Sequence, residues 1–291
     1  MRGNLGFFRK SNLNFFPEMI SAFYPFCDTC GVTLYCGDCL EVLEGLEGTV
    51  FDACITDPPF GTTQCSWDSV IDFDKMWNAL SHCVKEDGAV VLFGTEPFSS
   101  HLRLSAGHGF HFKYDWVWHK SKSGSAFSAK YRPVCKHEMI SVFGRGRTVY
   151  NPQTTPGTPY SRNHKKSSDD KNNHKIGLSA GGRSVNDGFR HPTTVQFFQQ
   201  KWRRQDQLHP TQKPVELMEY LIRTYTNEGD IVLDFAAGSG TTGIAAMNCG
   251  RKCVLIEKEP KYCDIARKRL IDNAGIFGLA EQNQDDAESA S

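Results

Sequence analysis

The first stretch whose residues could carry out chemistry is Thr56-Asp57-Pro58-Pro59-Phe60. It follows an apolar, β-prone run at 50–55, so we expect it at the end of a strand. The two prolines fix φ and remove backbone donors, so the chain leaves the sheet stiffly, with Asp57 and Phe60 in defined directions. This arrangement could hold a flat ring that carries an amine. Taken alone, Asp-Pro-Pro is also a common turn sequence, so other motifs must decide.

A second candidate site is the glycine-rich stretch from Asp234 to Gly243. A strand is predicted before it at 231–233, and a helix after it to about Cys249. Glycines let the turn pass close to a ligand, and a helix start adds unpaired N–H groups. The next predicted strand, 253–257, ends in Glu257, whose carboxylate could accept hydrogen bonds from ribose hydroxyls. The pattern therefore predicts a site for a nucleoside-containing cofactor.

This loop also satisfies Gly-x-Gly-x-x-Gly, which is typical of nicotinamide-dependent enzymes. Such enzymes usually place the loop first and continue with further strands, whereas here only a helix at 260–272 and an acidic tail follow. Asp234, directly before the loop, would repel a pyrophosphate but could hold the ammonium of an amino-acid moiety. These features favour S-adenosylmethionine over a dinucleotide.

Alternating strand and helix patterns surround the two motifs and must position them. Strands are predicted at 32–35, 50–55, 89–93, 114–118, 137–143, 231–233 and 253–257. Helices are predicted at 40–46, 73–84, 101–105, 214–226 and 260–272, besides the one after the loop. This alternation is typical of βαβ units and a parallel sheet.

The composition is that of a globular protein with a core of its own. The 291 residues include 39% hydrophobic and 23% charged residues, which suits one large α/β domain or one domain with an insertion. No apolar run approaches the roughly 20 residues of a membrane span, and no signal peptide is predicted. We expect a cytoplasmic protein of a bacterial, archaeal or phage-infected cell.

The eleven cysteines are scattered and odd in number, which suits reduced thiols better than a disulfide framework. Cys27-x-x-Cys30 and Cys36-x-x-Cys39 are paired like zinc knuckles, but only five residues separate the pairs. Free thiols are therefore favoured over a zinc site, and no metal is predicted.

A strongly basic segment interrupts the alternation between Arg145 and Arg204. It contains twelve Lys and Arg residues against three Asp residues, and aromatic residues such as Tyr160 and Trp202 lie among the cations. Cations pair with phosphates and aromatic rings stack on bases, so the segment is a candidate nucleic-acid interface. A solvated, flexible insertion would have a similar composition.

The ordered set of motifs resembles that of amino-methylating DNA methyltransferases of the permuted β type. The matching segments are Gly37-Asp38, Thr56 to Gly61, Trp118-His119-Lys120, His137-Glu138, His209 to Pro214, Asp234 to Thr242, and Glu257. The resemblance implies a Rossmann-like α/β fold with a mostly parallel seven-stranded sheet, flanked by helices and carrying a target-recognition insertion. It also implies that Asp57 and Gly238 share one edge of the sheet.

The resemblance divides the chain into five parts. These are an N-terminal extension (1–30), the catalytic part of the methyltransferase domain (31–144), the target-recognition insertion (145–207), the cofactor-binding part of the same domain (208–274), and an acidic tail (275–291) that is expected to be disordered. Double-stranded DNA is expected to bind through the basic residues 145–204.

The family also implies roles for individual residues. Asp57 and the carbonyl of Pro58 would bind the target amine, Pro59 would stiffen the turn, and Phe60 would stack on a base rotated out of the duplex, for transfer by direct displacement. The implied cofactor-binding residues are Asp234, Phe235, Ala236, Gly238, Gly240, Thr241 and Thr242 for the methionine part, Glu257 for the ribose, Asp38 for the adenine amine, and Lys213 for the donor's carboxylate.

Two residues of the first motif bear on the target base. Phe60 stands where the family more often has Tyr, so stacking is kept but a phenolic hydrogen bond is lost. Asp57 rather than Ser before Pro-Pro favours adenine N6; cytosine N4 is the alternative, and a non-catalytic DNA-binding protein is a third. The sequence leaves open the DNA site, the oligomeric state, a homodimer included, and the biological role, whether restriction–modification, phage self-modification or solitary DNA marking.

Overall fold

The computed structural model describes residues 27–46, 48–61, 69–123, 129–163, 183–200 and 212–289, with side chains as far as residue 275. Most of the predicted N-terminal extension lies outside the described residues. So do parts of the basic insertion (164–182 and 201–207) and the first part of the motif at 209–214. The chain forms two compact units, residues 1–151 with 195–291 and residues 152–194.

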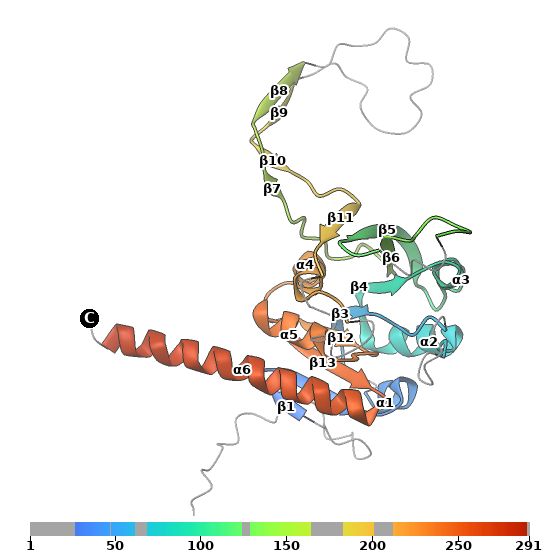
Figure 1. Ribbon diagram of the computed structural model, residues 1–291, viewed down its shortest axis with the longest axis vertical. Helices are drawn as coiled ribbons and strands as arrows, with labels where there is room; N and C mark the ends of the chain where they lie inside the picture. Colours follow the sequence, from blue (N-terminus) through green and yellow to red (C-terminus); the bar gives the residue numbers. More distant parts are fainter. Residues whose placement is uncertain are drawn as a thin grey trace, which may run out of the picture. The chain divides into compact units, whose positions relative to one another are not determined.

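A mostly parallel sheet forms the centre of the first unit (Figure 1). The strand order is β1-β2-β13-β12-β3-β4-β6-β5-β11. The strands are β1 Cys27–Thr29, β2 Val32–Cys36, β3 Phe51–Thr56, β4 Val84–Gly94, β5 His111–Lys120, β6 His137–Gly144, β11 Val195–Phe198, β12 Ile231–Asp234 and β13 Lys252–Glu257. The strands from β2 to β4 in this order run parallel, and β6 is antiparallel to both of its neighbours. The expected mostly parallel sheet is confirmed, and β1 and β11 extend it beyond the expected seven strands.

Helices cover both faces of this sheet (Figure 1). They are α1 Cys39–Gly45, α2 Phe73–Cys83, α3 Phe98–Leu104, α4 Val215–Tyr225, α5 Thr241–Asn248 and α6 Pro260–Ser289. Buried side chains of α1, α2 and α3 share one core cluster, and those of α4, α5 and α6 share the other. In β4, Val90 and Leu92 join the first cluster whereas Ala89, Val91 and Phe93 join the second, as the two-residue period of a strand requires.

The basic insertion holds more regular structure than its sequence indicates. The second unit contains two antiparallel pairs, β7 (Thr155–Pro156) with β10 (Phe189–Arg190) and β8 (Tyr160–Asn163) with β9 (Arg183–Asn186). The next strand, β11, returns to the main sheet beside β5. These strands have two to four residues, too few to show the alternation of polar and apolar residues on which strand prediction depends.

The two largest differences from the predicted boundaries concern β4 and α6. Strand β4 begins at Val84, directly after α2, because Val84 pairs with Phe51 ahead of a β-bulge. Helix α6 continues to Ser289 rather than ending at Asp272. Along the described part of the chain, no helix is both long and apolar enough to cross a bilayer.

The parallel strands place the candidate motifs together. Asp38, Asp57, Asp234 and Glu257 each lie at or directly after the carboxyl end of β2, β3, β12 or β13. Because these four strands are neighbours and run in the same direction, their carboxyl ends form one edge of the sheet. Ligands of open α/β sheets bind at this edge.

Tyr225 of α4 makes a polar contact in an otherwise apolar interface. Its hydroxyl accepts a hydrogen bond from Trp116 Nε1 (2.5 Å) and lies 3.1 Å from the hydroxyl of Tyr114. We expect Tyr225→Phe to lower the free energy of unfolding by about 1–3 kcal/mol, because the buried indole N–H loses its acceptor. Urea unfolding followed by tryptophan fluorescence measures this change.

The matched control is Tyr131→Phe, which removes a hydroxyl from a side chain that is 88% exposed. It should stay within about 0.5 kcal/mol of the wild type. Equal stabilities of the two variants would show that the hydroxyl of Tyr225 does not support the packing of α4 on β5.

Candidate active site

A hydrogen bond joins the two predicted motifs. The hydroxyl of Thr56, at the end of β3, donates to Asp234 Oδ1 over 2.8 Å and accepts from the backbone N–H of Phe235 over 3.0 Å. Thr56 is fully buried. The first residue of the predicted catalytic stretch (residues 56–60) therefore fixes the start of the glycine-rich loop, 178 positions later in the sequence.

Asp234 acts mainly within the loop. Besides Thr56, its carboxylate accepts from the hydroxyl of Thr242 and from the backbone N–H of Ala236. Burial raises the pKa of Asp234, and the hydrogen bonds from Thr242 and Thr56 oppose that rise. Asp234 lies in the cavity wall, but its oxygens already hold the loop, so its predicted contact with a ligand ammonium stays a prediction.

Glu257, at the end of β13, is bound by the backbone on both oxygens. Oε2 accepts from Gly238 N–H (2.7 Å) and Oε1 from Glu259 N–H (2.8 Å). Burial raises the pKa of Glu257, although these hydrogen bonds lower it in part. Each carboxylate oxygen can accept a second hydrogen bond, so the oriented side chain still offers acceptors to a ligand in the cavity.

The predicted loop residue Gly240 has a different environment from its neighbours. Its φ is +74°, and a Cβ there would lie 3.0 Å from the Cβ of Ala266 in α6. It is absent from the cavity wall, which Gly238, Thr241 and Thr242 do line. The structure thus explains Gly240 by backbone conformation and close helix packing.

Asp38 caps α1 at the cavity wall. Its Oδ1 accepts from Leu40 N–H (3.0 Å), and its Oδ2 pairs with Lys258 Nζ (3.1 Å). Burial raises the pKa of Asp38, but the bonds from Lys258 and Leu40 outweigh that effect and lower it. Asp38 is therefore an ionised hydrogen-bond acceptor in the cavity wall.

Asp57 pairs with a lysine that the sequence assigned to the cofactor. Lys213 Nζ lies 2.5 Å from Asp57 Oδ2 and 3.2 Å from Glu138 Oε2, and the Lys213 side chain is only 7% exposed. Lys120 pairs with the other Glu138 oxygen over 2.8 Å. Lys213 thus contacts the catalytic stretch directly; its predicted contact with the donor's carboxylate stays a prediction.

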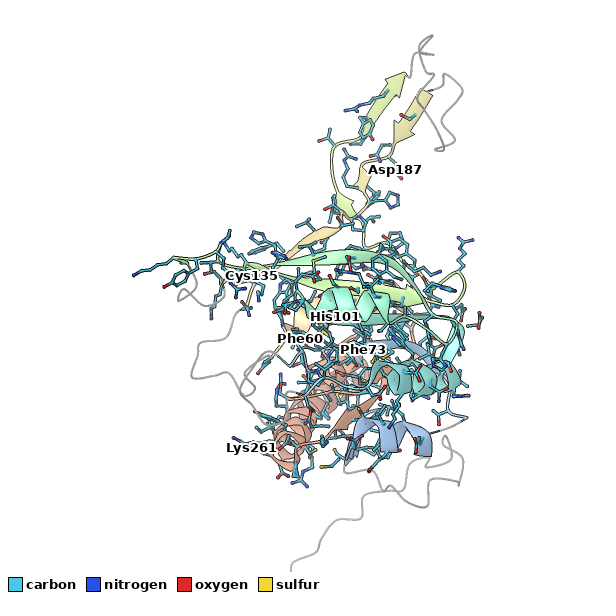
Figure 2. The ribbon with its side chains drawn as sticks, turned by 90° about the vertical axis from the view of Figure 1, so that its right-hand side faces the viewer. Phe60, Phe73, His101, Cys135, Asp187 and Lys261 are labelled. Atoms are coloured by element: carbon cyan, nitrogen blue, oxygen red, sulfur yellow. The ribbon has the colours of Figure 1, made fainter. Side chains whose placement is uncertain are left out.

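Phe60 lies where the catalytic stretch meets α3. Its ring centroid is 5.0 Å from that of Phe98 in α3, and Figure 2 shows Phe60 beside this helix, which carries His101. Phe60 is half-buried and lines the cavity together with Pro58 and Pro59. Part of its surface therefore faces the space in which a ligand would lie.

One cavity of about 340 Å³ brings these groups together. Among the residues in its wall are all but one of the predicted site residues: Asp38, Asp57, Pro58, Pro59, Phe60, Lys213, Asp234, Phe235, Ala236, Gly238, Thr241, Thr242 and Glu257. Only Gly240 is outside the wall. The tertiary structure therefore gathers both motifs into one site.

Three residues that support the site were not predicted for it. Thr56 joins the motifs, and Glu138 holds Lys213. Arg269 of α6 donates to the carbonyl and the hydroxyl of Ser239 and to the hydroxyl of Thr241 over 3.2 Å. Thr56 and Glu138 belong to motifs that the sequence analysis had already singled out, so their place near the site could have been predicted. Arg269 belongs to no such motif, and nothing in the sequence of α6 distinguishes it.

Of the cysteines, Cys39 lies in the cavity wall, where burial raises the pKa of its thiol to about 11. The cysteines in the described residues are free thiols, and no three His, Cys, Asp or Glu side chains gather there as a metal site. Burial raises the pKa of Cys54, Cys253 and Cys263. These cysteines are therefore unionised and are not candidate nucleophiles.

Comparison with known proteins agrees with this geometry. The N6/N4 DNA methylase family model matches residues 51–268, which span both motifs. The chain belongs to this family. Among its relatives, the Type II methyltransferase M2.LlaDCHI of Lactococcus lactis subsp. cremoris is 26% identical over 282 residues, covering 88% of this chain and 94% of its own. The DNA adenine methyltransferase YhdJ of Escherichia coli (strain K12) is 25% identical, covering 86% of this chain and 85% of its own.

Solved structures share the fold of this DNA methylase. The M1.HpyAVI–SAM complex has a TM-score of 0.57 and 26% identity, covering 82% of this chain and 98% of its own. The cytosine-N4-specific PvuII DNA methyltransferase, at 16% identity, has a TM-score of 0.56 and covers 87% of this chain and 95% of its own. The expected family and fold are confirmed.

The link between the motifs can be tested by Thr56→Val, which keeps the shape of the side chain and removes the hydroxyl. Asp234 Oδ1 loses a donor and Phe235 N–H loses its acceptor, so we expect the free energy of unfolding to fall by about 1–3 kcal/mol or more. Affinity for S-adenosylmethionine should fall as well. Urea unfolding and calorimetric titration measure the two effects.

Thr49→Val is the matched control. Thr49 is also buried, but its hydroxyl has no hydrogen-bond partner among the described residues. The same substitution there should leave stability unchanged or raise it, because no hydrogen bond is lost. Similar losses in both variants would show that the Thr56 hydroxyl does not join the motifs.

Proposed function

We propose that this DNA methylase transfers a methyl group from S-adenosylmethionine to the N6 amine of an adenine flipped out of duplex DNA. The observation that carries the proposal is that Asp57 and the loop after Asp234 line one cavity. A site of this kind can hold a methyl donor and an amine next to each other, which supplies the proximity that a direct transfer requires.

The residues present fit a nucleoside that carries an amino acid. Glu257 and Asp38 are oriented carboxylates in the wall, suited to the ribose hydroxyls and to the adenine amine. Gly238 and the start of α5 form the stretch of backbone beside the predicted methionine part. The crystal structure of the relative M1.HpyAVI contains SAM, which supports the same ligand here.

The target amine would be held by the catalytic stretch. Asp57 and the carbonyl of Pro58 each accept one of its N–H bonds, while Phe60 stacks on the base. The base must leave the duplex, because its amine is otherwise paired and out of reach. In this position the nitrogen lone pair is free to point at the donor.

Bound S-adenosylmethionine supplies an electrophilic methyl group on a sulfonium. As the N–C bond formed, the C–S bond would break with its electron pair left on sulfur as a neutral thioether, and the methylated amine would release one proton to solvent. Asp57 stabilises the positive charge that develops on nitrogen, so it must be ionised to act. Burial raises the pKa of Asp57 to about 6, with Lys213 opposing that rise; we therefore expect activity to fall as the pH falls through this region.

Adenine is proposed over cytosine because the catalytic stretch has Asp57 before Pro-Pro. The relative YhdJ is by name a DNA adenine methyltransferase, which supports this choice. Cytosine N4 is the second candidate, since an exocyclic amine of similar geometry would meet the same acceptors and the cytosine-N4-specific PvuII enzyme has the same fold.

The basic insertion 145–207 is proposed to bind the DNA around the target. Within the second unit, the guanidinium groups of Arg190 and Arg162 lie 5.0 and 5.2 Å from the ring centroid of Tyr160. Arginine next to an exposed aromatic ring suits both phosphates and unstacked bases. The residues of the insertion do not reveal which DNA sequence is recognised, so that sequence is to be found by experiment.

The test is methyl transfer from labelled S-adenosylmethionine to duplex DNA of mixed sequence, followed by digestion to nucleosides. We expect label in N6-methyl-2′-deoxyadenosine. Asp57→Ala should reduce transfer by at least a thousandfold, because the amine loses its charged acceptor, and should leave donor affinity within a few fold of the wild type.

Label in N4-methyl-2′-deoxycytidine would show that the target is cytosine rather than adenine. Absence of any methylated base, with donor binding intact, would contradict the proposed reaction. Substantial transfer by Asp57→Ala would contradict the role of Asp57 alone.

A further inference from the structure

Four alternating charges form a chain that ends at Asp57. Lys120 Nζ is 2.8 Å from Glu138 Oε1, Glu138 Oε2 is 3.2 Å from Lys213 Nζ, and Lys213 Nζ is 2.5 Å from Asp57 Oδ2. The charges of these four groups sum to zero. An isolated buried charge would cost several kcal/mol, so each member depends on its neighbour.

The position of Lys213 is fixed from several directions. Besides the two carboxylates, its ammonium lies 4.9 Å from the ring centroid of Phe93 in β4 and 5.9 Å from that of Phe60. A cation over an aromatic face is attracted to the ring, and more strongly when desolvated. Lys213 therefore has little freedom to turn toward another ligand.

The carboxylate of Asp57 is held on one side only. Oδ2 accepts from Lys213, whereas Oδ1 is buried and has no hydrogen-bond partner among the described residues. An unsatisfied buried acceptor is unfavourable, and an N–H donated by a bound amine would relieve this. Oδ1 is therefore the oxygen of Asp57 that can accept a hydrogen bond from the target amine.

We propose that Lys213 and Glu138 are positioning residues: Lys213 supplies the countercharge of Asp57 and fixes its carboxylate for the target amine, and Glu138 holds Lys213 in place. Glu138 acts on Asp57 through Lys213, and Lys120 completes the neutralisation of Glu138. This assigns Lys213 to the target side of the site. The part of the proposal that concerns the amine depends on the proposed function; the control of Asp57 by its neighbours does not.

The charges around Asp57 predict opposite effects for two variants. Lys213 of the segment before α4 lowers the pKa of Asp57, while Glu138 of β6 and Asp234 of β12 raise it. We expect Lys213→Met to move the acid limb of the pH–rate profile to higher pH, with at least a tenfold loss of kcat at pH 7. Glu138→Gln should move the same limb to lower pH. Methyl transfer measured from pH 5 to 9 gives both profiles.

Matched controls come from ion pairs at the start of β4. Lys85→Met and Glu86→Gln make the same chemical changes in side chains that pair with Asp52 and Arg145, and neither should shift the limb. If Lys213→Met does not fold, as thermal unfolding and donor titration would reveal, the Glu138→Gln profile decides alone. Profiles that coincide with the wild type, or shifts in one direction for both variants, would overturn the proposal.

A second measurement separates this proposal from the proposed function. Selective ¹³C labelling of aspartate carboxyl groups, with Asp57→Asn to assign the signal, follows the titration of Asp57 by NMR without donor or DNA. The titration midpoint should rise in Lys213→Met and fall in Glu138→Gln. If no DNA base is methylated but the midpoints shift as expected, the proposed function fails while the positioning network stands.

A separate observation concerns the connection between β5 and β6, of which residues 121–123 and 129–136 are described. It contains Lys122, Lys130, Arg132 and Lys136 and no acidic residue. Tyr131, in the middle of these cations, is 88% exposed. Lys130, Arg132 and Lys136 are all exposed, and none of them forms an ion pair with another described residue.

The loop begins and ends beside the active site. His119 pairs with His137 and Trp118 with Glu138 where β5 meets β6, and Glu138 contacts Lys213. Figure 2 shows Cys135 on this loop, where it projects from the sheet. A duplex that offers a base to Asp57 must bring its phosphates close to this edge.

We infer that this loop, outside the basic insertion, is a second contact surface for duplex DNA, with Lys130, Arg132 and Lys136 on phosphates and Tyr131 on a base. The inference rests on the proposed function, because DNA is the partner. Phosphate contacts give binding a steep salt dependence, with a slope of about −0.9 in log K against log salt for each contact.

The test is the triple variant Lys130→Gln, Arg132→Gln, Lys136→Gln, with duplex binding measured between about 50 and 200 mM salt. We expect the slope to become shallower by about 2–3 and donor affinity to be unchanged. The control Lys75→Gln, Lys85→Gln, Lys268→Gln removes exposed cations of α2, β4 and α6 and should keep the slope.

A wild-type slope in the loop variant would overturn the inference about the loop. A wild-type protein that binds no DNA would instead contradict the proposed function. Tyr131→Ala tests the aromatic contact separately, and the inference expects weaker DNA binding with an unchanged slope.

Discussion

The hydrogen bond between Thr56 and Asp234 is the interaction on which the site depends. It spans 2.8 Å between the ends of two neighbouring parallel strands, β3 and β12. The hydroxyl is both donor and acceptor, so it fixes Asp234 and the first backbone N–H after it. Because Asp57 is the next residue along the chain, the same contact sets the distance between the catalytic stretch and the glycine-rich loop.

The order of strands in the sheet makes this contact possible, although the two motifs lie in distant parts of the sequence. Residues far apart in sequence become neighbours because β12 inserts between β13 and β3. Helix α6 then packs on the loop, where Ala266 meets Gly240 and Arg269 binds Ser239. The conformation of the glycine-rich loop is thus set by strand β12 and by helix α6.

The electrostatics of the site follow from burial. Burial at this edge of the sheet disfavours the ionised form of the carboxylates. Lys213 offsets this effect between Asp57 and Glu138, and hydrogen bonds from backbone N–H groups offset it at Asp234 and Glu257. Lys213 keeps its proton, because its two carboxylates outweigh the burial that would lower its pKa. Charge is therefore available at the target side of the cavity while the cysteines nearby remain neutral.

The sequence by itself determined the fold class and the family, and all but one of the residues that it predicted for the site lie in the cavity wall. It could do so because the strands and helices are long enough to show their periods, and because each motif lies directly at a strand end. Stiff prolines and a glycine-rich turn are local properties, so they can be read without knowing what surrounds them.

Only the tertiary structure decided which side chains touch. Lys213 faces Asp57 and Glu138 because three segments distant in sequence converge there, and no local pattern encodes that convergence. The same holds for Arg269, for the packing that explains Gly240, and for the short strands of the insertion, whose pairing partners define them more than their own residues do. Non-local contacts are selected by the packing of the whole chain, and that is the information a single sequence does not display.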